Sequence, residues 1–269
     1  MAQGRIPQLS KEALALVALL GLALLAWLES AGRMAGMDAG PASDPGTVGF
    51  YLVTWVVMMA AMMLPSIAPM VLAHVAAEQE RAARGRGQTG ATGAFAAGYL
   101  LCWTAFGLGA YALLELGRSL HLGLLSWDRG GPYFAGAVVL AAAAYQLTSP
   151  KAACLSKCSA PRDFVRRHWH DGLGGALRMG VEHGAWCIGC CWALMAALFA
   201  LGAMNVGWMA CVAALIAIEK LAPWKPPANG AIAIVLVVLG LAVAVMPERV
   251  PGFTLPSSAN GGMTMQGGS

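Results

Sequence analysis

The chain has 269 residues, of which 58% are hydrophobic and 11% are charged, and its formal net charge is +4. Soluble globular domains have about 25% charged and about 45–50% apolar residues, so much of this chain needs a solvent other than water. The composition excludes a disordered chain, a collagen-like chain and a nucleic-acid-binding protein. It indicates a membrane protein, whose partners include the lipid bilayer.

A membrane-spanning helix needs about 20 mostly apolar residues, and seven segments of the chain approach or exceed this length. In chain order they are 13–28, 48–75, 91–116, 133–147, 175–202, 206–221 and 232–246. Backbone groups in lipid must be hydrogen-bonded within their own segment, so each span is expected to be a helix. The sequence therefore predicts an all-α fold, a polytopic transmembrane helical bundle of about seven spans.

The predicted spans divide the chain into four regions. They are an N-terminal membrane anchor helix at 1–30, an external Met-containing loop at 31–47, a helical membrane domain at 48–247 and an external Gly/Met-containing tail at 248–269. Arg5 and Lys11 give the first span the positive flank of a signal peptide. Its apolar core is long, however, and no small–x–small cleavage pattern follows it, which favours a retained anchor.

Lys and Arg residues are unevenly divided between alternate loops. Thirteen of the 17 fall in one set, which includes the N-terminus and the 162–171 loop, and four fall in the other. Because Lys and Arg are enriched in cytoplasmic loops, this division predicts a cytoplasmic N-terminus and an external C-terminus. The expected location is the cytoplasmic (inner) membrane of a bacterium.

The fifth predicted span carries side chains that bind metals. At about 100° per residue, one helix face within an arc of about 80° presents four of them. They are Met179, His183, Cys187 and Cys190, and Cys191 lies beside this face. Thiolates and thioethers are the ligands that Cu(I) prefers, whereas thiolates with imidazole also suit Zn(II). The sequence predicts a metal site here, with Cu(I) as the first choice and Zn(II) as the second.

Isolated cysteines have a simpler interpretation, because Cys packs well as a small hydrophobic residue. This explanation is sufficient for Cys102 and Cys211, which stand alone on their helices. Glu182 differs, because ionisable groups in membranes are costly and usually functional. Its position beside His183 makes it a candidate metal ligand, a partner of a ligand or a proton acceptor.

A second pair of cysteines, Cys154 and Cys158, follows the fourth predicted span. If the local backbone is helical, the i, i+4 spacing puts both sulfurs on one face. The fifth span begins on the same side of the membrane, so the two groups of cysteines are expected to meet. Sites with four ligands in two pairs are common for zinc, but the spacing is not that of a zinc ribbon, and simple packing remains an equal alternative for this pair.

Methionines are frequent, with 15 in the chain. In the second span, Met58 and Met62 share a face with Pro65 and Pro69, and Pro65 is expected to kink the helix. We expect this face to point into the bundle beside the fifth span, where the two thioethers could relay Cu(I). The alternative is that flexible Met side chains only fill gaps. Further methionines are expected outside the membrane, namely Met34, Met37, Met263 and Met265.

The sixth span ends with an adjacent acid and base, Glu219 and Lys220. Lys220 is expected to extend its ammonium group to the membrane surface, whereas Glu219 is expected to face the bundle.

Several stretches resemble a known family. They are WVVMMAAMMLP at 55–65, CIGCCWALM at 187–195 and GAMNVGWM at 202–209, followed by Glu219 and Lys220. Together they cover about 50–225 and resemble the bacterial predicted metal-binding integral membrane proteins, a domain-of-unknown-function family whose members are sometimes labelled copper chaperones. The resemblance implies metal binding.

Three functions remain open. The first is a copper-handling membrane protein (a chaperone, transfer protein or transporter) that serves a membrane copper enzyme or another complex subunit. The second is a membrane thiol-disulfide oxidoreductase, although the predicted topology places the thiols in the reducing half of the membrane. The third is a non-catalytic or haem-associated subunit, for which His183 is the only well-placed axial histidine, although Met can also bind haem iron. No nucleotide-binding, His-Glu-x-x-His or nucleophilic serine motif is present, so an enzyme is not expected.

Overall fold

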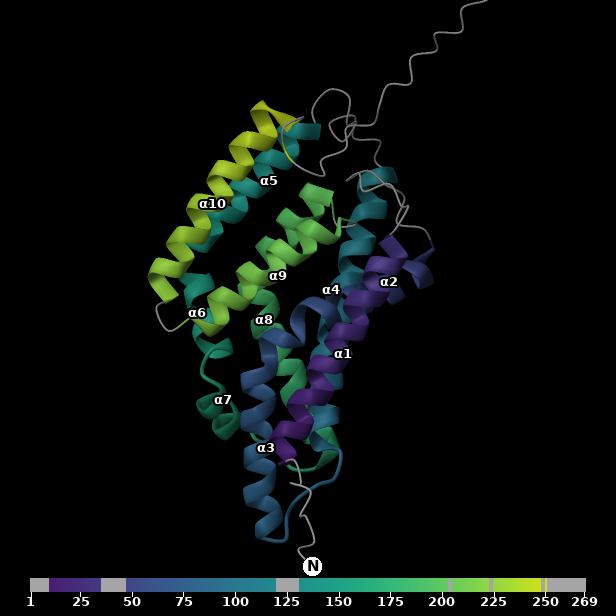
Figure 1. Cartoon of the computed structure of the whole chain (residues 1–269), viewed down its shortest axis with the longest axis vertical. Helices are drawn as coiled ribbons and strands as arrows, with labels where there is room; N and C mark the ends of the chain where they lie inside the picture. Colours follow the sequence, from purple (N-terminus) through teal and green to yellow (C-terminus); the bar gives the residue numbers. More distant parts are fainter. Residues whose placement is uncertain are drawn as a thin grey trace, which may run out of the picture.

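The computed structural model describes residues 10–34, 47–119, 131–202, 205–222, 225–247 and 250. Over these residues it contains helices joined by short turns and no strand, which confirms the all-α prediction (Figure 1). The helices are α1 (Lys11–Met34), α2 (Val48–Met63), η1 (Pro65–Ile67), α3 (Ala68–Ala83), α4 (Ala91–Ser119), α5 (Gly131–Gln146), α6 (Ser149–Cys158), α7 (Pro161–Arg167), α8 (Gly172–Gly202), α9 (Val206–Leu221) and α10 (Lys225–Val245).

Each predicted span contains a helix, but the helices differ in length. In the described part of the chain, four are long and apolar enough to cross a membrane, namely α1, α4, α8 and α10. The bent pair of α2 with η1 and α3 makes up to five. Helices α5 and α9 have 16 residues each, which is about 24 Å and less than the roughly 30 Å of a bilayer core. The count of seven spans therefore stays a prediction.

The predicted kink at Pro65 is present as a complete break. Helix α2 ends at Met63, a short 3-10 turn follows, and α3 continues at an angle of 45°. Proline causes this because it has no N–H group for the helical hydrogen bond and its ring clashes with the preceding turn. Within the turn, the Ser66 hydroxyl donates to the Met63 carbonyl at 2.8 Å. The break thus places a polar side chain inside the bundle.

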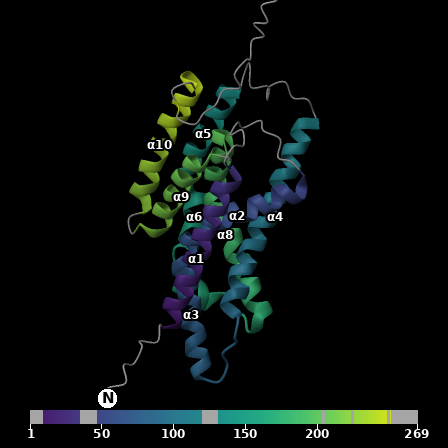
Figure 2. The same ribbon diagram turned by 45° about the vertical axis from the view of Figure 1, so that its right-hand side comes forward.

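Helix α8 is the central element of the bundle. It packs against α4, α5, α6 and α9, and Figure 2 shows it between α4 on one side and the α5–α10 pair on the other. Helices α4 and α8 come very close together, because a side chain at Gly180 would collide with the Phe95 carbonyl and one at Gly184 would meet Cys102. These successive contacts also show that α4 and α8 run parallel, as expected for the third and fifth spans.

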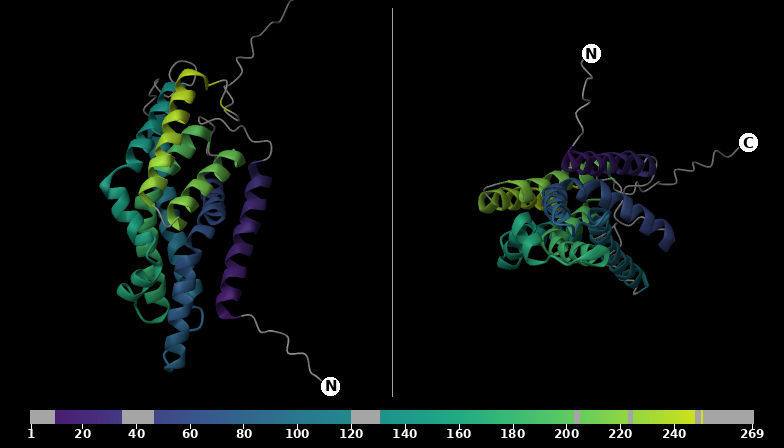
Figure 3. Two further views of the ribbon diagram at one scale, coloured as in Figure 1. Left: turned by 60° about the vertical axis from the view of Figure 1, so that its left-hand side comes forward. Right: turned by 90° about the horizontal axis from the view of Figure 1, so that it is seen from below.

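Helix α1 lies at one edge of the bundle, as both views in Figure 3 show, and packs against α2 and α3. Most of its leucines are exposed, and they are Leu14, Leu20, Leu22, Leu24, Leu25 and Leu28. An apolar surface of this kind suits contact with lipid rather than water. Several of the buried polar groups lie instead around α8, in the interior of the bundle.

Candidate metal centre

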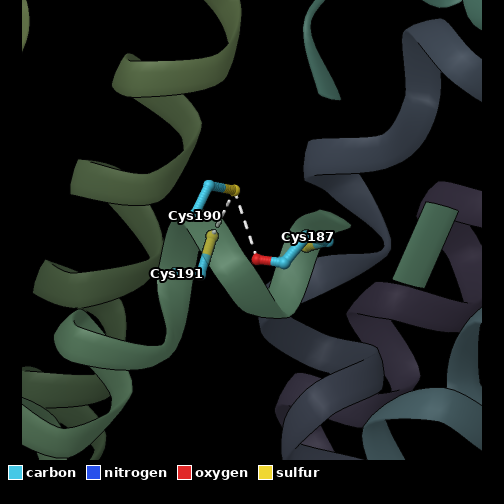
Figure 4. Close-up of side chains that lie close together, drawn as sticks. All are labelled: Cys187, Cys190 and Cys191. Atoms are coloured by element: carbon cyan, nitrogen blue, oxygen red, sulfur yellow. Dashed lines mark hydrogen bonds between the residues drawn. The ribbon is translucent and has the colours of Figure 1, made fainter. Parts of the chain in front are cut away.

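Three thiols gather on consecutive turns of α8. The Sγ atoms of Cys187, Cys190 and Cys191 all lie within 4.8 Å of one another, and all three residues are fully buried (Figure 4). Cys190 Sγ lies 3.3 Å from Cys191 Sγ, and it donates a hydrogen bond to the Cys187 carbonyl at 3.2 Å. The helical spacing of three and one residues produces this group, because positions 187, 190 and 191 share one side of a helix.

The second pair of cysteines reaches this group through α6. Cys158 Sγ lies 3.8 Å from Cys190 Sγ, so the expected meeting of the two groups is found. Cys154 lies one turn earlier and is only partly buried; a side chain at Gly189 would approach its sulfur to 2.6 Å. Burial raises the pKa of the Cys154 thiol above its ordinary value. The absence of a side chain at Gly189 is what allows α6 to lie so close to α8.

The spacing of these sulfurs suits a shared metal ion. Metal–sulfur bonds are about 2.3 Å long, so two sulfurs on one ion lie about 3.8 Å apart in a tetrahedral site and up to about 4.6 Å apart in a linear one. The Cys158–Cys190 separation of 3.8 Å matches this range, and the 3.3 Å between Cys190 and Cys191 requires only a small adjustment. A donor set made of thiols is suited to a soft metal.

A buried lysine lies beside the thiols. Lys220 Nζ is 3.0 Å from Cys187 Sγ and 3.1 Å from Ser66 Oγ, and its side chain is only 7% exposed. The expectation that Lys220 extends to the membrane surface is therefore wrong. The break at Pro65 explains the difference, because it supplies the Ser66 hydroxyl as a hydrogen-bond partner inside the protein.

A second buried lysine supports the same region. Lys151 Nζ donates to both carboxylate oxygens of Glu219, at 2.8 and 2.9 Å, and to the Cys190 carbonyl at 2.9 Å. The predicted inward orientation of Glu219 is thus confirmed, and neither residue is measurably exposed. One ion pair joins α6, α8 and α9 around the thiols. Sequence reasoning missed Lys151, although an inward-facing Glu219 already required a cation near it.

The family of the chain follows from comparison with known proteins. A family model described as copper chaperone, PpoB2, matches residues 52–243. The chain belongs to this copper chaperone family. The match covers most of the chain and confirms the resemblance found in the sequence. It includes the methionines of α2 and every cysteine of the site. Neither the curated proteins nor the solved structures contain a significant match.

The sequence predicts His183 as a ligand of the same site as the cysteines, but its surroundings are aromatic. It is buried among aromatic rings, with ring centroids of Phe95, Tyr99 and Phe164 at 6.0, 5.7 and 5.2 Å, and its Nδ1 has no partner. Among the described residues, the compact group of possible ligands contains the three cysteines and not His183. Tyr99 connects the two regions, because its hydroxyl lies 3.0 Å from Cys187 Sγ.

Glu182 points away from the thiols. Its carboxylate accepts a hydrogen bond from Arg178 Nε at 3.0 Å, one turn earlier on α8, in a partly exposed ion pair. The structure therefore does not bring Glu182 together with the cysteines. The i, i+4 pairing on the helix surface accounts for its position.

Met58 and Met62 are buried, at 4% and 2% exposure, so the predicted inward face of α2 is confirmed. Helix α2 packs mainly against α1, α4 and α9, and it reaches α8 where Trp55 stacks on Phe199 at 5.7 Å. A relay role for the two methionines stays a prediction. Of the methionines expected outside the membrane, Met34 is buried at the end of α1. The others, Met37, Met263 and Met265, lie outside the described residues.

Proposed function

We propose that this protein is an integral membrane copper chaperone that holds Cu(I) as cargo on Cys187, Cys190 and Cys191, with Cys158 as a further ligand. One observation carries the proposal: three fully buried thiols lie within 4.8 Å in a chain that belongs to a copper chaperone family. Thiolate ligands suit Cu(I) best, and Zn(II) is the second choice. The chain has no motif for catalysis, so we propose a carrier rather than an enzyme.

The charge of Lys220 supports a cargo held by thiolates. Cu(I) bound by two or three thiolates carries a net charge of −1 or −2, and the ammonium group 3.0 Å from Cys187 Sγ would balance all or part of it. Uncompensated charges inside a protein are strongly destabilising, so a buried ammonium group beside the thiols suits an anionic metal–thiolate group. The preference for Cu(I) over Zn(II) rests on the softness of the sulfur ligands.

The length of the apolar part of α8 supports a position of the thiol group near one surface of the membrane. From His183 to Gly202 this helix has no Asp, Glu, Lys or Arg, and those 20 residues cover about 30 Å, the thickness of a bilayer core. Cys187 and Cys190 then lie one to two turns inside the membrane, on the side where α6 and α7 pack. We propose that this is the cytoplasmic side of the bacterial inner membrane, and that α5 and α9 complete seven spans.

Such a position suits delivery to a membrane partner. Cu(I) moves between proteins by exchange of ligands, so a shallow site beside a short helix can pass its cargo to another chain. We propose a membrane copper enzyme, or another subunit of such a complex, as the recipient.

Metal analysis of the purified, reduced protein tests this function. Wild-type protein is titrated with Cu(I) under a competing chelator and compared with Cys187→Ser and Cys190→Ser. We expect each substitution to weaken binding by about a hundredfold, at or beyond the upper end of losses seen for supporting residues of metal sites. Cys211→Ser is the matched control, because Cys211 is exposed and outside the site. Equal binding by all four proteins would exclude the thiol site.

Thiol–disulfide exchange is a second candidate, favoured by the 3.8 Å between Cys158 Sγ and Cys190 Sγ. Mass analysis under mild oxidation separates the two functions. An oxidoreductase should form the Cys158–Cys190 disulfide reversibly and pass it to a dithiol substrate. A copper carrier should lose Cu(I) when this disulfide forms and should show no such turnover.

A further inference from the structure

His74 on α3 is a fully buried histidine outside the thiol group. Its Nδ1 lies 3.1 Å from the Thr92 hydroxyl, and its Nε2 has no hydrogen-bond partner. When Nδ1–H donates to Thr92 Oγ1, Nε2 carries the free lone pair. Histidines that bind metals show this arrangement, in which one ring nitrogen is held by an oxygen atom and the other is left for the ion.

A second buried histidine with an unpartnered ring nitrogen lies on α8. His183 is 1% exposed, and its Nδ1 has no partner. Both imidazoles stack on the ring of Phe95, at 5.3 Å for His74 and 6.0 Å for His183. Buried polar groups without a partner are costly and need an explanation. Two of them on one aromatic ring point to a shared ligand chemistry rather than to chance packing.

Each of these histidines follows a buried methionine by four residues. Met70 precedes His74 on α3, and Met179 precedes His183 on α8, with exposures of 2% and 0%. Residues at i and i+4 are neighbours on a helix, so a thioether and an imidazole share a face in both places. Thioether sulfur is a soft ligand that selects Cu(I), and imidazole also binds copper.

The position of these pairs links the molecular surface to the thiols. Trp169, in the segment between α7 and α8, stacks on His74 at 5.3 Å and is half-buried. Its indole N–H donates to Asp171, which also pairs with Arg81. At the other end, Tyr99 stacks on His183 and contacts Cys187 Sγ. The two Met–His pairs therefore lie between Trp169 and the thiol group.

We propose that Met70 with His74, and Met179 with His183, are two further binding positions for a soft monovalent cation, through which the cargo moves between the Trp169 end and the thiols. The movement of the cargo toward the thiols rests on the proposed function. Binding of a cation at the two Met–His pairs does not. Each transfer exchanges one sulfur–metal and one nitrogen–metal bond for new bonds to the next pair, and the ion stays monovalent throughout. On arrival at the cysteines, thiol protons pass to water as thiolate bonds form.

Silver(I) tests the proposal, because it is a soft monovalent ion without the redox chemistry of copper. The full chain is titrated after Cys158, Cys187, Cys190 and Cys191 are all replaced by Ser. We expect it to retain Ag(I) binding, which His74→Phe and Met70→Leu each weaken by about tenfold or more. His74→Phe keeps a stacking ring, and Met63→Leu is the control, since Met63 is equally buried but has no histidine four residues later.

A measurement on wild-type protein keeps the test independent of folding of the variants. Ring-nitrogen NMR of isotope-labelled histidine should show a shift of the His74 Nε2 signal when Ag(I) is added. No shift, or equal Ag(I) binding by Met70→Leu and Met63→Leu, would overturn the proposal. Failure of the proposed function would give a different result: wild-type protein and the variant with four Ser replacements would then bind the same amount of Ag(I), and the His74 shift would persist.

Discussion

Lys220 and Cys187 are 33 residues apart in the chain, yet the ammonium nitrogen of one lies 3.0 Å from the sulfur of the other inside the bundle. The positive charge of Lys220 thus lies at the place where we expect a metal cation to bind. The contact is understandable if the loaded site is anionic, because a fixed positive charge then neutralises the metal–thiolate group in a medium of low dielectric constant.

Replacing Lys220 by Met tests this interpretation. The loaded site would lose its compensating charge, so we expect Cu(I) affinity to fall by about tenfold to a hundredfold, as for other residues that support metal ligands. Chelator competition measures the affinity. Lys220→Arg, which keeps the charge, should retain most of it, and an unchanged or higher affinity in Lys220→Met would show that the ammonium group only opposes the cargo.

The Lys151–Glu219 pair should matter for stability more than for binding. Breaking a buried ion pair from one side leaves an uncompensated charge and costs about 3–5 kcal/mol. We therefore expect Lys151→Met and Glu219→Gln each to lower the thermal unfolding temperature in detergent. The double variant Lys151→Met/Glu219→Leu should recover much of the loss, because it buries no charge. A double variant that is less stable than either single one would contradict this explanation.

Gly189 provides a test of the role of α6 that leaves every thiol in place. In Gly189→Ala the new methyl group would lie 2.6 Å from Cys154 Sγ, so that side chain must give way, and any shift of α6 away from α8 would take Cys158 with it. We expect weaker Cu(I) binding, by about tenfold, with an unchanged number of reactive thiols. Gly174→Ala is the matched control on the same helix, because a side chain there meets nothing within 4 Å.

The membrane topology can be tested with reporter fusions. The distribution of Lys and Arg predicts that the 162–171 segment is cytoplasmic and the 257–269 tail external. A phosphatase reporter should therefore be active only on the tail, and a cytoplasmic fluorescent reporter only in the 162–171 segment. Activity of the same reporter at both places would require an even number of spans between them, where the prediction has three, and would remove the seven-span arrangement.

Met58 and Met62 can be tested together in cells. Replacing both by Leu keeps the side-chain volume and should cost less than about 1.5 kcal/mol of stability. If the thioethers relay copper, the double variant should lose copper tolerance, or maturation of a copper enzyme, at normal protein level. An unchanged copper phenotype would show that both residues only pack in the core.

The helices and their order could be predicted because lipid leaves few alternatives to an apolar helix. Span lengths were less certain, and α5 and α9 end sooner than a bilayer requires. The thiol group was also predictable, since Cys187, Cys190 and Cys191 lie within two turns of one helix. In contrast, Lys151 and His74 were missed. Their roles depend on partners from other helices, Glu219 for the first and Thr92 with Phe95 for the second, and sequence spacing does not reveal such contacts.

Three of the four clustered sulfurs belong to one long helix, whose backbone is fixed by tight contact with α4, whereas Cys158 belongs to the ten-residue helix α6. In the proposed site, the number of sulfur ligands would therefore depend on this one short helix. A shift of α6 by a few ångströms would convert a four-sulfur site into a three-sulfur site without disturbing the membrane core. A partner that docks on α6 would thus have a direct means of loosening the cargo at the moment of delivery.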